Sequence, residues 1–161
     1  EVRTLFFNVP ARRKFLKSDS AETSRVSDAI ESIAMAHPHV AFELRSSGRK
    51  LLDLAATDEP AKRTLDVLGK ELGPELLEFE EHFPELGGLI VRGFAGRPSI
   101  ARPTARAIRI HLNGRPIMDR SVLHAVREAY RGLVDSARTP TVALILEIGR
   151  ASCRERVCLY V

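Results

Sequence analysis

One segment, residues 107–134, constrains the fold of this chain more than any other. Its first six residues alternate with period two, which predicts a strand with its aliphatic side chains facing inward and Arg109 and His111 facing outward. Asn113-Gly114 follows directly and is typical of a tight hairpin turn. The periodicity then changes to that of a helix, so a strand, a turn and a helix are predicted in this order.

The predicted helix continues to about Val134 and has two different faces. Its apolar, buried face comprises Val122, Val126, Ala129, Tyr130 and Leu133. Its other face carries basic residues at i, i+4, i+7 and i+11, namely Arg120, His124, Arg127 and Arg131. A row of guanidinium groups suits repeated phosphates better than a small substrate. The alternative for Arg127 and Arg131 is an ion pair with Glu128 or Asp135.

Charges are segregated along the sequence. Residues 53–88 carry ten acidic and three basic side chains, a net of −7, whereas residues 92–138 carry ten arginines and three acidic side chains, a net of +7. Residues 1–17 add five basic side chains against Glu1. Separated fields of opposite sign favour an anionic partner on one surface. The alternative is a solvated surface whose charges pair within the molecule.

The rest of the chain predicts an α+β fold. We expect a strand over 1–7, a short helix from Pro10 to about Lys17, and a helix over 21–36 that is capped near Ser18 and has Val26, Ile30, Ile33 and Ala34 facing inward. A hairpin over 40–56 and a helix over 59–69 should follow. The remaining strands are an antiparallel pair, 76–83 and 88–95, with the first at the edge of the sheet, and a central strand, 141–148. This order gives a mostly antiparallel sheet with one strand–helix–strand unit. Such crossovers are right-handed in about 98% of cases.

Two long motifs resemble the MutL family of DNA mismatch repair proteins. They read EVRTLFFNVPARRKFLK over residues 1–17 and NGRPIMDRSVLHAVREAY over residues 113–130, and the resemblance extends to about residue 148. It implies a transducer domain like the second domain of ribosomal protein S5, with a left-handed strand–helix–strand crossover. This domain would span 37–148, and 1–36 would be the end of a gyrase/Hsp90/histidine-kinase-type ATPase domain with a connecting helix.

The resemblance also implies a function. Such a protein is an ATP-gated matchmaker that binds DNA non-specifically and couples mismatch recognition to strand incision. Its implied partners are double-stranded DNA, a second copy of itself, a mismatch-recognition protein and a downstream endonuclease or helicase, in the cytoplasm at the nucleoid and away from membranes. A basic residue at the start of the helix contributes to DNA binding in the family, which corresponds to Arg120; Arg115 is a second candidate, with bonding to local carbonyls as its alternative.

ATP and Mg²⁺ are the cofactors that the resemblance implies for the parent protein. The family's general-base Glu, magnesium-binding Asn, Asp-x-Gly-x-Gly segment and glycine-rich lid are not found in this sequence. We therefore expect the chain to neither bind nor hydrolyse ATP by itself, and we assign it no catalytic or metal-binding residues.

Residues 149–161 have no periodicity that continues the preceding strand. Ile148 to Val157 resembles a translated sequencing adaptor, so we interpret 149–161 as read-through that is not native. The alternative is a metal-binding terminus with Cys153 and Cys158 as ligands. Two thiols are too few for a closed zinc site, which needs four ligands.

Two other functions are compatible with such a fold. The chain could be the transducer of a type II topoisomerase B subunit, although the residues of the two motifs argue against it. It could also be a stand-alone RNA-binding module of the ribosomal S5 type, which would bind RNA more tightly than duplex DNA.

Overall fold

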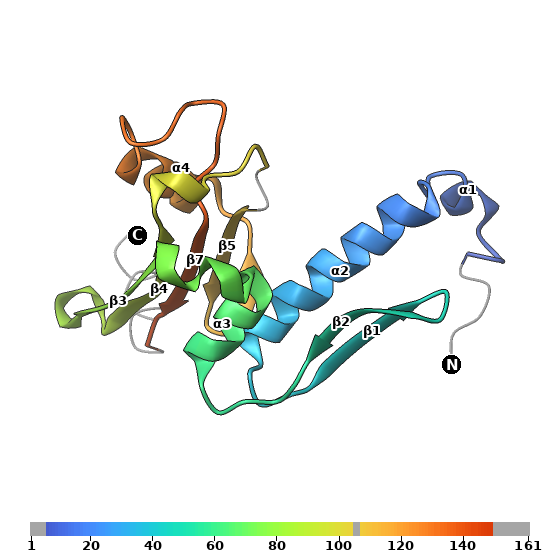
Figure 1. The fold of residues 1–161 in the computed structure, drawn as a ribbon, viewed down its shortest axis with the longest axis horizontal. Coiled ribbons are helices and arrows are strands. Elements are labelled where there is room, and N and C mark those ends of the chain that lie inside the picture. Colours follow the sequence, from blue (N-terminus) through green and yellow to red (C-terminus); the bar gives the residue numbers. More distant parts are fainter. Residues whose placement is uncertain (1–5, 105–106, 150–161) are drawn as a thin grey trace, which may run out of the picture.

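A five-stranded sheet with the strand order β3-β4-β7-β5-β6 forms the centre of the molecule, and a separate hairpin, β1-β2, lies beside it (Figure 1). The computed structural model describes residues 6–104 and 107–149. The strands are β1 (Phe42–Ser46), β2 (Arg49–Leu54), β3 (Leu76–Phe83), β4 (Leu89–Gly96), β5 (Ile108–Leu112), β6 (Arg115–Ile117) and β7 (Val142–Glu147). The helices are α1 (Pro10–Arg13), α2 (Asp19–Ala36), α3 (Pro60–Leu68) and α4 (Arg120–Ala129), with 3₁₀ turns η1 (Lys70–Glu75), η2 (Pro84–Leu86) and η3 (Pro98–Ile100). The predicted α+β class, both antiparallel pairs, the edge position of β3 and the central position of β7 are confirmed.

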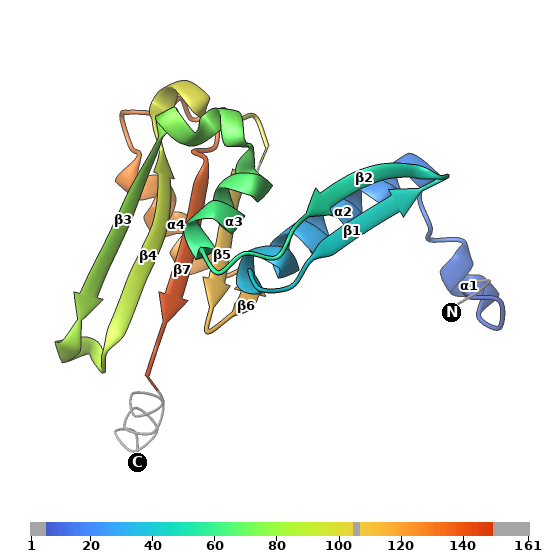
Figure 2. The same cartoon turned by 60° about the horizontal axis from the view of Figure 1, so that its bottom comes forward.

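The connection from β5 to β7 is a crossover with a defined handedness. These two strands are parallel neighbours, from Ile108 opposite Val142 to Leu112 opposite Leu146, and the chain between them forms β6 and α4. In Figure 2 both strands point downward, α4 lies behind the sheet, and β7 lies to the left of β5. This arrangement is a left-handed crossover, which is the rare hand for such units. The expectation drawn from the family resemblance is confirmed, and the generic rule is not.

Helices cover both faces of the middle of the sheet. On one face, α2 and α3 pack over a cluster that contains Met35, Leu76, Phe94 and Ala143. On the other face, α4 packs over Ile108, Ile110 and Val142. Because β5 lies between two helical layers, neither of its faces is free for solvent.

Arg109 and His111 show the consequence of this double cover. His111 is 1% exposed, and its Nε2–H donates to the carbonyl oxygen of Ser32 in α2 over 2.8 Å. Arg109 lies 2.5 Å from the Glu31 carboxylate of the same helix. The prediction that both side chains face outward is therefore wrong. The alternation of β5 is real, but α2 covers the face that the pattern assigned to solvent.

The first half of α2 extends away from the sheet together with the hairpin β1-β2, so that the two form an arm (Figure 2). Helix α2 begins after Ser18, whose side chain accepts from the Ala21 N–H, and it contacts both strands of the hairpin. Of its predicted apolar stripe, Ala34 is buried, but Val26 and Ile33 are nearly half exposed. The predicted apolar stripe of α2 is therefore only partly confirmed. The domain boundary at residue 36 stays a prediction.

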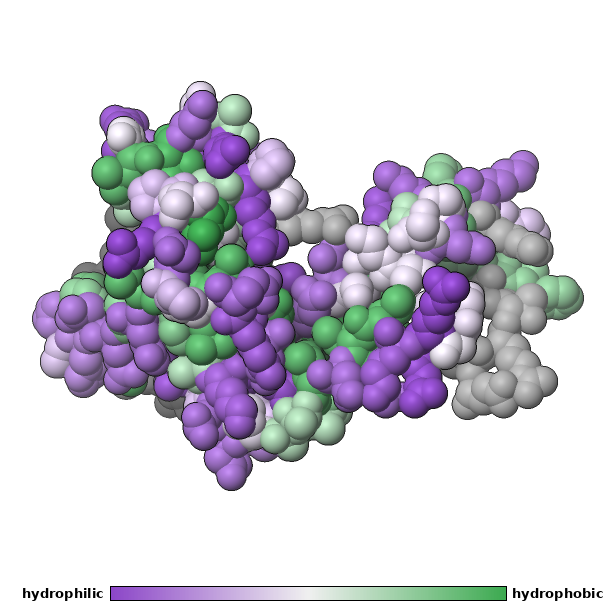
Figure 3. Space-filling model, viewed as in Figure 1, coloured by the Kyte–Doolittle hydropathy of each residue, from purple (hydrophilic) through white to green (hydrophobic). Residues whose placement is uncertain are grey.

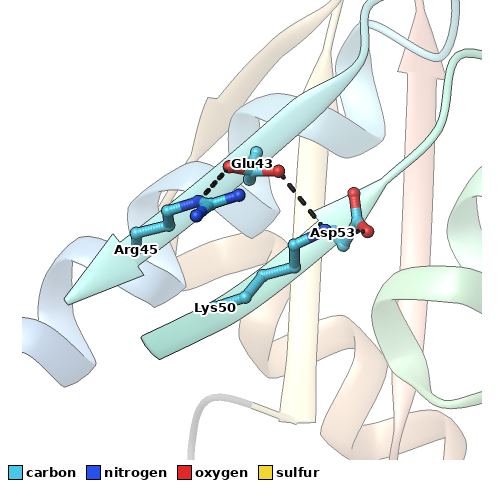
Figure 4. Close-up of polar contacts among 4 residues, drawn as sticks. All are labelled: Glu43, Arg45, Lys50 and Asp53. Carbon is cyan, nitrogen blue, oxygen red and sulfur yellow. Dashed lines mark hydrogen bonds and ion pairs between the residues drawn. The ribbon is translucent and has the colours of Figure 1, made fainter. Parts of the chain in front are cut away.

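Ion pairs cross the exposed face of the hairpin (Figure 4). The Glu43 carboxylate lies 2.5 Å from Arg45 and 3.3 Å from Lys50, and Lys50 lies 2.7 Å from Asp53. Hydrogen bonds from Arg45 and Lys50 lower the pKa of Glu43, and the bond to Asp53 is the main cause that raises the pKa of Lys50. Because all four groups are exposed, the pairs orient side chains more than they stabilise the fold.

The two ends of the chain fall partly outside the described residues. Of the strand predicted over 1–7, only Phe6 and Phe7 are described, and they lie in a turn. Helix α1 ends at Arg13, before the predicted Lys17. The interpretation of 149–161 concerns residues that, after Gly149, are not described. Within the described ranges, none of the helices is long and apolar enough to cross a membrane.

Candidate nucleic-acid interface

A two-residue turn joins β5 to β6 and presents the first candidate side chain. Asn113 and Gly114 have φ values of 47° and 74°, and Leu112 pairs with Arg115 across the turn. Positive φ at both central residues is the conformation whose twist matches that of paired strands, and Asn-Gly is the dipeptide that adopts it most readily. The predicted turn is confirmed, and Arg115 leaves it with an exposed side chain.

Helix α4 presents the second candidate. Asp119 caps the helix, since its Oδ1 accepts from the N–H groups of Ser121 and Val122 over 2.9 and 3.0 Å. Arg120 is the first helical residue and is exposed. The cap fixes where the helix begins and therefore fixes the direction in which Arg120 leaves the backbone.

The buried face of α4 holds it on the sheet. Val122, Leu123, Val126 and Tyr130 pack against the β5–β7 cluster, and the Tyr130 hydroxyl donates to the Gly96 carbonyl oxygen over 2.8 Å. Ala129 and Leu133, which were expected on this face, are exposed. The apolar prediction was thus right for Val122, Val126 and Tyr130 and wrong for Ala129 and Leu133.

The helix is shorter than the sequence pattern indicated, which changes the position of Arg131. It ends at Ala129, Tyr130 is the cap residue, and Gly132 has a φ of 77° that no helix can continue. Arg120 and Arg127 therefore share one helical face, about 10 Å apart along the axis at 1.5 Å per residue. Arg131 lies beyond the helix, 2.7 Å from Glu128. The ion pair that we considered as an alternative for Arg131 is present.

The other three candidate arginines have exposed side chains. Among the described residues, no hydrogen bond or ion pair engages the guanidinium groups of Arg115, Arg120 or Arg127. The alternatives of local carbonyl bonding for Arg115 and an ion pair for Arg127 are therefore not seen. An exposed guanidinium group without an internal partner can bind a phosphate without first breaking an internal bond.

Arg138 is a further cation that the sequence argument did not single out. It lines a hollow of about 440 Å³ at the end of α4 together with Arg127 and Arg131. Arg138 is one of the ten arginines of residues 92–138. It follows Asp135-Ser136 in a loop, where no periodicity could relate it to the helix. Asp135 accepts from the Ala137 N–H and thereby shapes this loop.

Acidic and basic side chains lie at opposite edges of the sheet. Glu78, Glu80 and Glu81 belong to β3 at one edge, whereas β6 with Arg115 forms the other. Figure 3 shows hydrophilic residues covering the end of the β3-β4 hairpin. Some of the basic segment is neutralised internally, because Arg92 pairs with Glu147 and Arg109 with Glu31. The segregation seen in the sequence is thus kept in space, with a smaller positive surplus than the sequence count.

The arrangement presents exposed cations on a turn and on a helix. In the portion of the chain that the structure describes, no group of three or more His, Cys, Asp or Glu side chains could hold a metal ion. The geometry places three exposed arginines on a capped helix and beside a two-residue turn, and none of the three has a partner among the described residues.

Comparisons with known proteins agree on one family. Residues 64–153 match the family model described as DNA mismatch repair protein, C-terminal domain. The chain is 44% identical over 153 residues to the DNA mismatch repair protein MutL of Paramagnetospirillum magneticum and 41% identical over 155 residues to that of Brucella anthropi. These matches cover 92% and 94% of this chain but only 25% and 24% of the relatives. The chain therefore spans about a quarter of the length of these relatives.

Two solved structures are similar to the fold. The Aquifex aeolicus MutL ATPase domain complexed with ADP has a TM-score of 0.69 and 28% sequence identity, over 92% of this chain and 51% of that one. The N-terminal domain of a DNA repair protein has a TM-score of 0.70 at 21% identity, over 89% of this chain and 47% of that one. The second likeness concerns the fold alone.

Proposed function

Since the chain belongs to the MutL family of DNA mismatch repair proteins, we propose that it binds duplex DNA without sequence preference through Arg115, Arg120 and Arg127. We expect Arg131 to contribute less to this binding, because its ion pair with Glu128 neutralises part of its charge. Each arginine would contact a phosphate and position the duplex, and none would read a base.

The observation that supports this proposal most is the pairing state of the arginines. Arg92, Arg109 and Arg131 have carboxylate partners, whereas the guanidinium groups of Arg115, Arg120 and Arg127 have none in the described ranges. The free cations lie on β6, at the edge of the sheet opposite to the acidic strand β3, and on α4, which covers one face of the sheet. An anionic polymer would be attracted to the cations of β6 and α4 and repelled from β3.

The activity of the whole protein is a wider proposal that rests on the relatives. The solved chain of the Aquifex MutL ATPase domain, which was complexed with ADP, is about twice as long as the part that this chain matches. We propose that the parent binds ATP and Mg²⁺ with residues outside this chain, forms a homodimer, and acts as an ATP-gated matchmaker. It would link a mismatch-recognition protein to strand incision by an endonuclease or helicase.

Charge reversal at Arg120 tests the DNA assignment. We expect Arg120→Glu to weaken binding to a fully paired duplex about tenfold at low salt, because one phosphate contact is lost and a repulsion is added. The slope of log affinity against log salt should decrease by about 0.9. Fluorescence anisotropy with labelled duplex, measured between about 50 and 200 mM salt, gives both quantities.

Arg49→Glu is the matched control, since Arg49 is an exposed residue of the distant hairpin and the charge change is the same. It should alter affinity far less than Arg120→Glu. Equal losses for the two variants would mean that only net charge matters. Unchanged affinity of Arg120→Glu at low salt would refute the assignment.

A further inference from the structure

Asn113 does more than form the turn between β5 and β6. Its main-chain N–H donates to the Leu146 carbonyl oxygen over 2.9 Å, which continues the β5–β7 ladder by one bond. Its side-chain Oδ1 accepts from the Ile148 N–H over 2.8 Å, and its Nδ2 donates to the Ile148 carbonyl oxygen over 3.3 Å. One residue of the turn therefore makes three hydrogen bonds to the end of β7.

The side chain replaces a main-chain group that the turn removes. In a regular parallel ladder, the bond after the one from Asn113 to Leu146 would run from the Ile148 N–H to the main-chain oxygen of residue 113. Because Asn113 has a φ of 47°, its main chain bends away toward β6, and Oδ1 accepts the bond instead. The ladder is thereby extended past the last regular strand residue.

This pairing explains the residue type better than the turn does. Glycine and aspartate also adopt positive φ in such turns. Glycine offers no side chain to Ile148, and an ionised aspartate offers acceptors without a donor. Only the asparagine amide can both accept from the N–H and donate to the carbonyl oxygen of the same residue, as it does here.

The consequence concerns Arg115, two residues further along. It lies in β6, a three-residue strand at the edge of the sheet next to β5. Such a short edge strand has few hydrogen bonds of its own to fix its direction. The bonds of Asn113 tie the turn to the central strand β7, and so restrict the path of the backbone that carries Arg115.

We propose that Asn113 is a positioning residue for the DNA contact of Arg115, because it anchors the arginine-bearing turn to the end of β7. This inference rests on the proposed DNA-binding function. It assigns Asn113 no contact with DNA of its own. The side-chain amide acts by holding Arg115 in the orientation that reaches a phosphate.

A double-mutant cycle on the full 161-residue chain tests the proposal. Asn113→Gly keeps the positive φ of the turn and removes only the side-chain bonds. We expect it to lower the affinity for a fully paired duplex about three- to tenfold at low salt, as Arg115→Ala does. Both changes should reduce the salt slope by about 0.9. The double variant should be no weaker than Arg115→Ala, whereas Asn113→Gly combined with Arg120→Ala should multiply the two losses.

Ser47→Gly is the matched control, because Ser47 has a φ of 50° in the equivalent turn between β1 and β2. It should leave DNA affinity unchanged, and circular dichroism should show that all variants fold. Independent, multiplying losses for Asn113→Gly and Arg115→Ala would overturn the inference while leaving the proposed function intact. If neither Arg115→Ala nor Arg120→Ala lowers the affinity for DNA, the DNA assignment is overturned, and this inference with it.

Discussion

At the scale of single residues, burial changes the chemistry of His111 most. Its Nε2–H donates to Ser32, while Nδ1 is buried and has no hydrogen-bond partner among the described residues. Burial is the main cause that lowers the pKa of His111 below the usual 6.5, and the nearby charge of Arg109 acts in the same direction. The folded protein therefore holds His111 neutral, in the tautomer that carries its proton on Nε2.

This burial predicts a dependence of stability on pH. As the pH falls below 6.5, the unfolded chain takes up a proton at His111 before the folded chain does. The free energy of unfolding should therefore decrease as the pH falls through 6.5 and continue to decrease until the lower, folded pKa is passed. Urea denaturation at several pH values measures this decrease.

His111→Gln should flatten that profile, because its amide can still donate to Ser32 but does not titrate. His82→Gln is the control for the same substitution at an exposed position of β3. A His111→Gln profile as steep as that of the unsubstituted protein would contradict the prediction.

At the scale of elements, α4 depends on its N-terminal cap. The helix has ten residues, which is short for an isolated helix in water, and its stability comes from its packed face and its ends. We expect Asp119→Ala to lower the free energy of unfolding by about 1 kcal/mol, because two N–H groups lose their acceptor. Urea denaturation gives the value.

Asp119→Asn is the informative companion, since asparagine caps helices about as well as aspartate. It should recover most of the stability that Asp119→Ala loses. If both substitutions cost the same, the charge of Asp119 and not its capping bonds would be the stabilising factor.

At the scale of the whole molecule, Arg63 joins the arm to the sheet. It is 0% exposed on α3, and its Nη2 lies 2.7 to 2.8 Å from the carbonyl oxygens of Pro38, Val40 and Ala55 at the base of the hairpin. Its guanidinium carbon also lies 5.7 Å from the centre of the Phe42 ring. A buried cation whose Nη2 shares its two hydrogens among three carbonyl oxygens holds the loops on either side of β1-β2 to one helix.

We expect Arg63→Met to lower the free energy of unfolding by about 2 to 4 kcal/mol, because the buried carbonyl oxygen of Pro38 and the part-buried ones of Val40 and Ala55 lose their donor. Hydrogen exchange should rise first in β1 and β2, while β4 and β7 keep more of their protection. Lys62→Met is the control at the neighbouring, exposed position and should change little. Equal acceleration in both sheets would show that Arg63 supports the whole fold and not the joint.

The residue-level and element-level predictions succeeded where local chemistry dominates. Ser18, Pro60 and Asn113-Gly114 mark helix starts and a turn through their own side chains or ring, and the structure confirms all three. The extent of α4 was less predictable. Leu133 fits the apolar period, but Gly132 adopts a left-handed conformation that ends the helix first.

For this protein, the sequence by itself determined the order of most elements, although not β6, together with the strand and helix periods and the separation of charge, because each depends on neighbours within a few positions. The tertiary structure alone decided that Arg92 and Arg109 are neutralised, since they pair with Glu147 and Glu31 far along the chain. It also decided that α2 buries His111 and that Asn113 binds Ile148. These pairings depend on which elements are packed together, and no local period encodes that.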